Sequence, residues 1–237
     1  FISNSRGLKI VPIKPVNLRV RAGPYYISTL TIAAIQQDIL VVGTLVSPAE
    51  LGVYVIASRL AGIVLLPKIT AEIGYAPQVS RLFRANGRDA AIAHTRHSTR
   101  AYVPIMLLLT ILVVTVGPLV LEFLGAEFSR GYPVLLMLVT ANVILALTGH
   151  AGVLLIMIDS ERVQQFIFLI SAVVMFFLMF LLVPRYGING GAIAMVAGAT
   201  VRGLLGSIAI QKVLGTGVSA FHVFFSSRSK QSTYEAD

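Results

Sequence analysis

The chain has 237 residues, of which 56% are hydrophobic and only 12% are charged, and its net charge is +9. A soluble domain of this length needs a more polar surface, so this composition excludes a soluble globular protein and indicates a protein embedded in a membrane. Cysteine is absent, which excludes disulfides, thiol catalysis and cysteine-based metal sites.

Residues 1–22 precede the first apolar stretch and are polar and basic. They lack the apolar core and cleavage site of a signal peptide. Because the chain begins with Phe1 rather than methionine, we expect a fragment in which residues 1–22 are a cytoplasmic linker, once joined to something upstream.

Six apolar stretches follow, each long enough to cross roughly 30 Å of hydrocarbon as a helix of about 20 residues. The alternating pattern of β-barrel strands is missing, which favours helices. We therefore predict an all-α, polytopic membrane protein whose residues 23–213 form a bundle of six transmembrane helices. The predicted spans are residues 23–46, 51–73, 103–124, 133–158, 166–183 and 188–213.

Basic residues mark one side of this bundle. With six crossings both termini lie on the same side, and the connections there carry fourteen Lys and Arg residues, against only Arg130 and Arg185 on the other side. Cytoplasmic connections carry such an excess. We therefore place both termini, including the tail at residues 214–237, in the cytoplasm, and attribute the positive charge to membrane orientation rather than to nucleic-acid binding.

Several local features refine this arrangement. Pro67, inside the second span, predicts a kink. Residues 76–100 are polar and basic, which suits either a short helix lying on the inner leaflet or a solvated loop. The fifth span is predicted to face lipid, because it is rich in phenylalanine: Phe166, Phe168, Phe176, Phe177 and Phe180. The sixth is predicted to be buried, because its small residues allow close helix packing.

Asp38 is the first ionisable residue within a span and lies beside Gln36 and Gln37. A charge at this depth is expensive, so Asp38 is a candidate for coupling to a proton or cation, or a structural hydrogen-bond partner. The tip of the hairpin lies between Pro48 and Ala49, and Arg59 lies as many residues after that point as Asp38 lies before it. We predict that Asp38 and Arg59 form an ion pair or line the same aqueous cavity.

Arg202 lies in the small-residue span, where an arginine suggests a cavity wall or an anionic ligand such as a diphosphate, with snorkelling as the alternative. Lys68 lies nearer the edge of the membrane and is expected to snorkel. His150, in the fourth span, is able to titrate near neutral pH, but a lone histidine in an apolar helix is more often a packed structural residue.

The sequence lacks the common signatures of enzymes. It contains no Gly-x-x-x-x-Gly-Lys-Ser/Thr loop, no His-Glu-x-x-His and no Gly-x-Ser-x-Gly. We therefore expect no enzymatic activity, no cofactor and no metal site.

Three stretches resemble one family of transporters. Residues 37–60 look like the seventh and eighth helices of polysaccharide flippases, and residues 124–128 and 184–192 resemble further parts of these proteins. The flippases are oligosaccharide-lipid exporters related to multidrug and toxin extrusion transporters. The resemblance covers residues 23–213 and implies that the chain is the carboxyl-terminal lobe of such a protein, which needs an amino-terminal lobe or a partner chain.

The resemblance also implies a function. Members of the family move undecaprenyl-diphosphate-linked sugars across the bacterial inner membrane by alternating access, in polysaccharide and lipopolysaccharide biosynthesis. It implies that Arg59 and Arg202, with Gln36 and Gln37, bind an anionic lipid-linked oligosaccharide, and that Asp38 serves ion coupling. Two alternatives stay open: a cation-coupled multidrug antiporter of the same superfamily, and a membrane-bound polysaccharide-assembly enzyme or non-transporting subunit.

Overall fold

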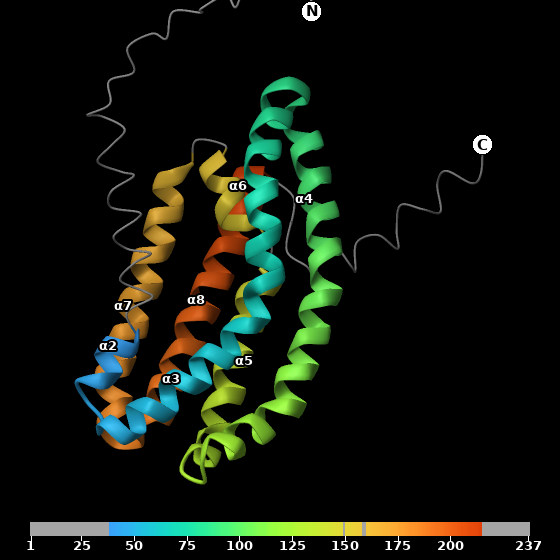
Figure 1. Ribbon diagram of the computed structural model, residues 1–237. Coiled ribbons are helices and arrows are strands. Elements are labelled where there is room, and N and C mark those ends of the chain that lie inside the picture. Colours follow the sequence, from blue (N-terminus) through green and yellow to red (C-terminus); the bar gives the residue numbers. More distant parts are fainter. Residues whose placement is uncertain (1–37, 149, 158–159, 215–237) are drawn as a thin grey trace, which may run out of the picture.

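The computed structural model describes residues 38–148, 150–157 and 160–214, and within these ranges every regular element is helical (Figure 1). The prediction of an all-α protein is thus confirmed. The principal helices are α2 (Asp38–Gly43), α3 (Pro48–Gly62), α4 (Leu66–Leu124), α5 (Tyr132–Leu147), α6 (Ala151–Met157), α7 (Glu161–Tyr186) and α8 (Ile188–Leu214).

Five segments within the described ranges are long and apolar enough to cross a membrane: Pro48–Tyr75, Asp89–Leu124, Phe128–Leu147, Glu161–Tyr186 and Ile188–Lys212. This is the pattern of a multi-pass membrane protein. Of the predicted first span only the carboxyl-terminal part, carrying α2, is described, and residues 1–37 and 215–237 lie outside the described ranges.

The turns between the spans lie at two ends of the bundle (Figure 1). One end, here called the Gly125 end, holds the Ser47 turn before α3, the Gly125–Gly131 connection and the Gly187 turn. Ser47 and Glu50 form a capping box there, in which each side chain hydrogen-bonds the backbone N–H of the other. The opposite end, the Gly87 end, holds the turn inside α4, the start of α7 and the end of α8.

The α4 helix corrects the prediction for residues 76–100. These residues form neither a loop nor a helix on the leaflet: they extend the second and third spans as a helical hairpin that reverses at Gly87, where φ is 78° and ψ is −167°. Glycine has no Cβ and adopts this conformation without strain. The two arms pack through buried apolar side chains, including Tyr75, Val79 and Ile92, which stabilises the hairpin.

The predicted kink at Pro67 takes the form of a short 3₁₀ segment, Ile63–Leu65, between α3 and α4. Proline lacks an N–H group and its ring clashes with the carbonyl four residues earlier, so an α-helix does not continue through it. From α5, the amide Nδ2 of Asn142 donates a hydrogen bond of 2.9 Å to the Ala61 carbonyl beside the break. The same carbonyl also accepts from the Ile63 N–H, so the Asn142 bond adds a link from α5 to the backbone at the break.

The fourth predicted span, residues 133–158, is also corrected, because α5 ends at Leu147 and α6 begins only at Ala151. At the end of α5 the Tyr102 hydroxyl donates a 2.7 Å hydrogen bond to the Ala146 carbonyl. In a continuing helix, a backbone N–H four residues later would donate to this carbonyl. The Tyr102 hydroxyl takes the place of that donor. α6 has seven residues, too few to cross a membrane.

α8 packs against both α7 and α5, and its small residues permit close approach, as predicted. A Cβ atom on Gly198 would lie 2.9 Å from Cβ of Met175 in α7, and one on Gly203 would lie 2.8 Å from Cγ2 of Thr148, after α5. On α7, Phe166, Phe177 and Phe180 are exposed as expected for lipid contact. Phe168 is buried instead, because Arg202 packs on its ring.

Candidate functional site

Buried polar side chains are rare in the described ranges, and they fall into a few groups. The buried polar and charged residues are Asp38, Thr95, Thr99, His150, Gln164 and Ser171. Because an unsatisfied polar group is costly in an apolar bundle, each is a candidate for structural bonding or for function. The groups around Asp38, Arg202 and His150 carry the ionisable residues.

Asp38 begins α2 and is only 5% exposed. Its Oδ2 atom accepts a hydrogen bond of 2.9 Å from the hydroxyl of Tyr54 in α3, and Tyr54 is itself fully buried. A Cβ atom on Gly191 would lie 2.9 Å from Cγ2 of Val42 and 3.4 Å from the Tyr54 ring. The glycine in α8 therefore allows the α2–α3 hairpin to pack closely and keeps the carboxylate enclosed.

Arg59 lies on α3, and its side chain is exposed. Within the part of the chain that the structure describes, Asp38 and Arg59 are not within ion-pair distance, and the side-chain partner of Asp38 is Tyr54. The predicted direct pair is therefore not formed in this structure. The predicted roles of Asp38 in coupling and of Arg59 in substrate binding stay predictions, and Gln36 and Gln37 lie outside the described residues.

Arg202 projects from α8 onto an aromatic ring. Its guanidinium carbon lies 4.1 Å from the centroid of Phe168 in α7, a cation–π contact. The side chain also lines a small cavity between α5, α7 and α8, whose other lining residues are Leu145, Ser171, Met175, Met195, Gly198 and Ala199. Apart from Arg202 and Ser171, this lining is apolar.

Within the described ranges Arg202 forms no salt bridge to a carboxylate: Glu72 pairs with Lys68 instead and lies 3.5 Å from His150. Glu72 is the acidic group that acts electrostatically on Arg202. An arginine that is neither hydrated nor paired is expensive in a membrane. The site therefore offers an available positive charge beside a cavity.

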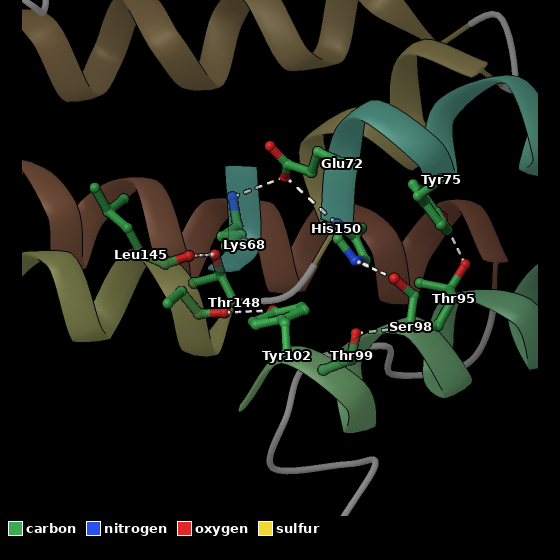
Figure 2. Close-up of polar contacts among 11 residues, drawn as sticks. Lys68, Glu72, Tyr75, Thr95, Ser98, Thr99, Tyr102, Leu145, Thr148 and His150 are labelled. Atoms are coloured by element: carbon green, nitrogen blue, oxygen red, sulfur yellow. Dashed lines mark hydrogen bonds and ion pairs between the residues drawn. The ribbon is translucent and has the colours of Figure 1, made fainter. Parts of the chain in front are cut away.

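A third group centres on His150, in the break between α5 and α6 (Figure 2). The imidazole is fully buried. Its Nε2 atom lies 2.9 Å from the Ser98 hydroxyl, and its Nδ1 atom lies 3.5 Å from Oε1 of Glu72. The same Glu72 oxygen forms a salt bridge with Nζ of Lys68, one turn earlier on α4, at a distance of 2.8 Å.

Two tyrosine rings enclose the His150 ring. Tyr75 stacks on it with 4.3 Å between centroids, and Tyr102 meets it edge-on at 5.2 Å. The Tyr75 hydroxyl lies 2.6 Å from the Thr95 hydroxyl, so both arms of the α4 hairpin contribute to the group. The enclosure holds the imidazole in one orientation and keeps lipid away from it.

Glu72 is the ionisable residue that the sequence analysis missed. It lies inside the predicted second span, 51–73, so the rule applied to Asp38 would have identified it. Its connection to His150 was not visible, because 78 positions separate the two residues and the break after α5 brings them together. Within the described ranges, no three side chains of the metal-ligating types gather as a metal site would require.

Five apolar helices and three ionisable groups held among them define the class of this protein: a polytopic helical membrane protein with charged residues inside its bundle. Comparison with models of protein families, with curated proteins and with solved structures finds no match for this chain.

Proposed function

We propose that this chain is the carboxyl-terminal lobe of a flippase that moves an undecaprenyl-diphosphate-linked oligosaccharide across the bacterial inner membrane. The observation that carries the proposal is Arg202, whose guanidinium lies on Phe168 beside a cavity, without an ion pair in the described ranges. A diphosphate is the kind of group that such a guanidinium binds, through paired charge-assisted hydrogen bonds.

The architecture supports a transport lobe. The predicted first span added to the five described spans gives six crossings, as one lobe of a multidrug-extrusion-like transporter would have. α8, which carries Arg202, packs on both α5 and α7 through glycines. An amino-terminal lobe or a partner chain would complete the cavity and allow alternating access, with no chemical step and no cofactor.

The orientation proposed for the lobe follows from charge. At the Gly87 end lie Arg81, Arg96, Arg100, Arg162 and Lys212, and at the Gly125 end lie Arg130 and Arg185. The Gly87 end is therefore assigned to the cytoplasm, and both termini of the chain with it. The lipid-linked sugar enters from that side and leaves at the Gly125 end.

A cation-coupled multidrug antiporter is the alternative, and the observation that favours it is the enclosed carboxylate of Asp38 bonded to Tyr54. A buried carboxylate suits a cationic cargo or a coupling ion, whereas a buried guanidinium suits an anionic cargo. A polysaccharide-assembly enzyme or a non-transporting subunit is the remaining alternative. The Ser98 hydroxyl does lie 2.9 Å from Nε2 of His150, but that imidazole is fully buried.

The test compares Arg202→Met and Arg202→Lys with the matched control Arg185→Met, an exposed arginine at the outer end. The variants are made in the intact gene, in cells that lack other flippases, and outward delivery is measured as lipid-linked sugar accessible to a glycan-binding probe on spheroplasts. Arg202→Met removes charge-assisted hydrogen bonds worth about 1.5–3 kcal/mol. Outward delivery of lipid-linked sugar is therefore expected to fall roughly ten- to a hundredfold.

Lysine keeps the charge but not the paired geometry, so Arg202→Lys is expected to fall between Arg202→Met and the wild type. The control is expected to transport normally. Normal delivery by Arg202→Met would refute the assigned role of Arg202. Efflux of cationic drugs that Asp38→Asn abolishes, with no delivery of sugar by the wild type, would establish the antiporter instead.

A further inference from the structure

The His150 group contains a buried nitrogen that lacks a hydrogen-bond partner. Nδ1 of His150 is enclosed and has none in the described ranges. The opposite nitrogen, Nε2, is occupied by the Ser98 hydroxyl at 2.9 Å. In the tautomer that carries its hydrogen on Nε2 and donates it to Ser98, Nδ1 presents a lone pair towards Glu72. This nitrogen is therefore a place where a proton can bind.

Glu72 supplies the negative charge beside Nδ1 and the route by which a proton reaches the ring. Its Oε1 lies 3.5 Å from Nδ1, too long for a strong hydrogen bond but close enough for one to form after a small movement. Its side chain is 24% exposed, whereas that of His150 is fully buried. Glu72 is therefore the outer group of the pair, through which a proton would reach the ring behind it.

The location of the site allows such a proton to move helices. Glu72 belongs to the descending arm of α4 and Ser98 to the returning arm, while His150 directly precedes the short α6. When a proton binds to Nδ1, the N–H that it creates donates to Glu72 and draws the start of α6 towards α4. When the proton leaves, that hydrogen bond is lost, and the ring keeps its contacts with Ser98, Tyr75 and Tyr102.

The charged and titratable neighbours come from all the elements that surround the ring. α4 supplies Glu72, which also binds Lys68, and Tyr75 and Tyr102, whose rings contact the imidazole. His94 stacks on the far side of Tyr75 at 5.7 Å, and α8 contributes Arg202, on which Glu72 acts electrostatically. Arg96 and Arg100 lie on either side of Ser98 in sequence. Glu72 thus contacts both Lys68 and His150, and it acts on Arg202 only at a distance.

We propose that Glu72 and His150 form a proton-binding site that couples proton movement to the transport cycle. The inference rests on the proposed function, whose coupling ion it names, and it places coupling at the α5–α6 break rather than at Asp38. The proton enters from one aqueous side through Glu72, resides on Nδ1 while α6 is held against α4, and leaves when the site faces the other side. While the proton resides there, Glu72 is drawn towards His150 and acts less on Arg202, which links proton binding to the proposed diphosphate site.

The first experiment measures protonation without transport. The imidazole ¹⁵N signals of the purified intact protein in nanodiscs are recorded, and the signals that His150→Gln removes are assigned to residue 150, one of four histidines in this chain. Histidine changes charge most readily between about pH 5 and 8. The expected result is a change of the residue-150 signals across that range that Glu72→Gln alters. Signals that stay constant would overturn the proposal.

The second experiment measures coupling as a ratio, which a partial loss of folded protein leaves unaffected. Outward delivery of lipid-linked sugar is compared with and without an imposed pH gradient of about one unit, which drives at most about a tenfold accumulation per proton. The wild type is expected to respond to the gradient. In His150→Gln and Glu72→Gln the ratio is expected to fall to unity.

Three controls keep the test specific. His97→Gln and Glu122→Gln replace exposed residues of the same types on α4, and both are expected to retain the wild-type ratio. Lys68→Met removes the other partner of Glu72 and leaves the contact with His150, so its ratio is also expected to stay above unity.

A wild-type ratio in His150→Gln would refute the proton site and leave the flippase proposal intact. Absence of all sugar delivery by the wild type, with a titrating His150, would refute the flippase proposal and the coupling role, and leave only the proton-binding site.

Discussion

Tyr54 donates a hydrogen bond to Asp38 across the turn between α2 and α3, with 2.9 Å between the two oxygens. Replacing Tyr54 with phenylalanine removes the donor and leaves a buried carboxylate oxygen unsatisfied. We expect a loss of about 1–3 kcal/mol in the free energy of unfolding, measured by thermal melting in detergent micelles. Tyr186→Phe, on a side chain that is 58% exposed, is the matched control and is expected to melt like the wild type. Equal melting temperatures for all three proteins would show that the bond stabilises nothing.

The contact between Asp38 and Tyr54 also predicts how Arg59 behaves. Arg59 is exposed, so Arg59→Ala is expected to change the unfolding free energy by less than about 0.5 kcal/mol. Exchanging the two charges, with arginine at 38 and aspartate at 59, is expected to be strongly destabilising, because arginine would be buried beside the Tyr54 hydroxyl. If the exchanged protein melts like the wild type, the two side chains pair directly after all.

Gly190 permits the tight turn between α7 and α8. A Cβ atom there would overlap the Leu182 carbonyl and lie 2.8 Å from the backbone nitrogen of Val183, and backbone atoms cannot move aside as a flexible side chain does. Gly190→Ala is expected to destabilise by about 1–3 kcal/mol in the same melting assay. Gly52→Ala, where a Cβ atom would meet nothing within 4 Å, is the control and is expected to be neutral or stabilising by up to about 1 kcal/mol. Equal effects at both positions would contradict the close approach.

Asn142 joins α5 to the break after α3 through the Ala61 carbonyl. Asn142→Leu is expected to cost about 0.5–1.5 kcal/mol, because the carbonyl loses its side-chain donor and keeps only the Ile63 N–H. Thr140→Val is the control, since that hydroxyl is exposed and bonds only to the Leu136 carbonyl of its own helix. A wild-type melting curve for Asn142→Leu would show that backbone donors alone satisfy the break.

The absence of cysteine permits a direct test of orientation. Arg81→Cys places a thiol near the Gly87 end, and Ser129→Cys places one at the Gly125 end, both at exposed positions. An impermeant maleimide added to intact spheroplasts is expected to label the thiol at 129 and to leave that at 81 unlabelled until the membrane is permeabilised. The reverse labelling would invert the assigned topology.

Much of the secondary structure was predictable because helix-forming apolar stretches and membrane thickness impose it locally. The spans expected at 166–183 and 188–213 are observed as α7 and α8 with longer ends. The hairpin at 76–100 was not predictable from polarity, because the buried cluster that stabilises it takes residues from both arms, with Val79 in one and Ile92 in the other. The break after α5 was likewise hidden in an apolar run, where Tyr102 supplies a hydrogen bond from another helix.

By itself the sequence determined that this protein is helical and crosses a membrane several times, because hydrocarbon requires the backbone to bond internally and charge to stay at the edges. Only the tertiary structure decided which charges meet. Equal depth along a hairpin predicted Arg59 as the partner of Asp38. In the structure, packing places the Tyr54 hydroxyl within hydrogen-bond distance of Asp38 instead. Glu72 and His150 come together because two helices break, and the positions of those breaks depend on contacts that no local stretch of sequence contains.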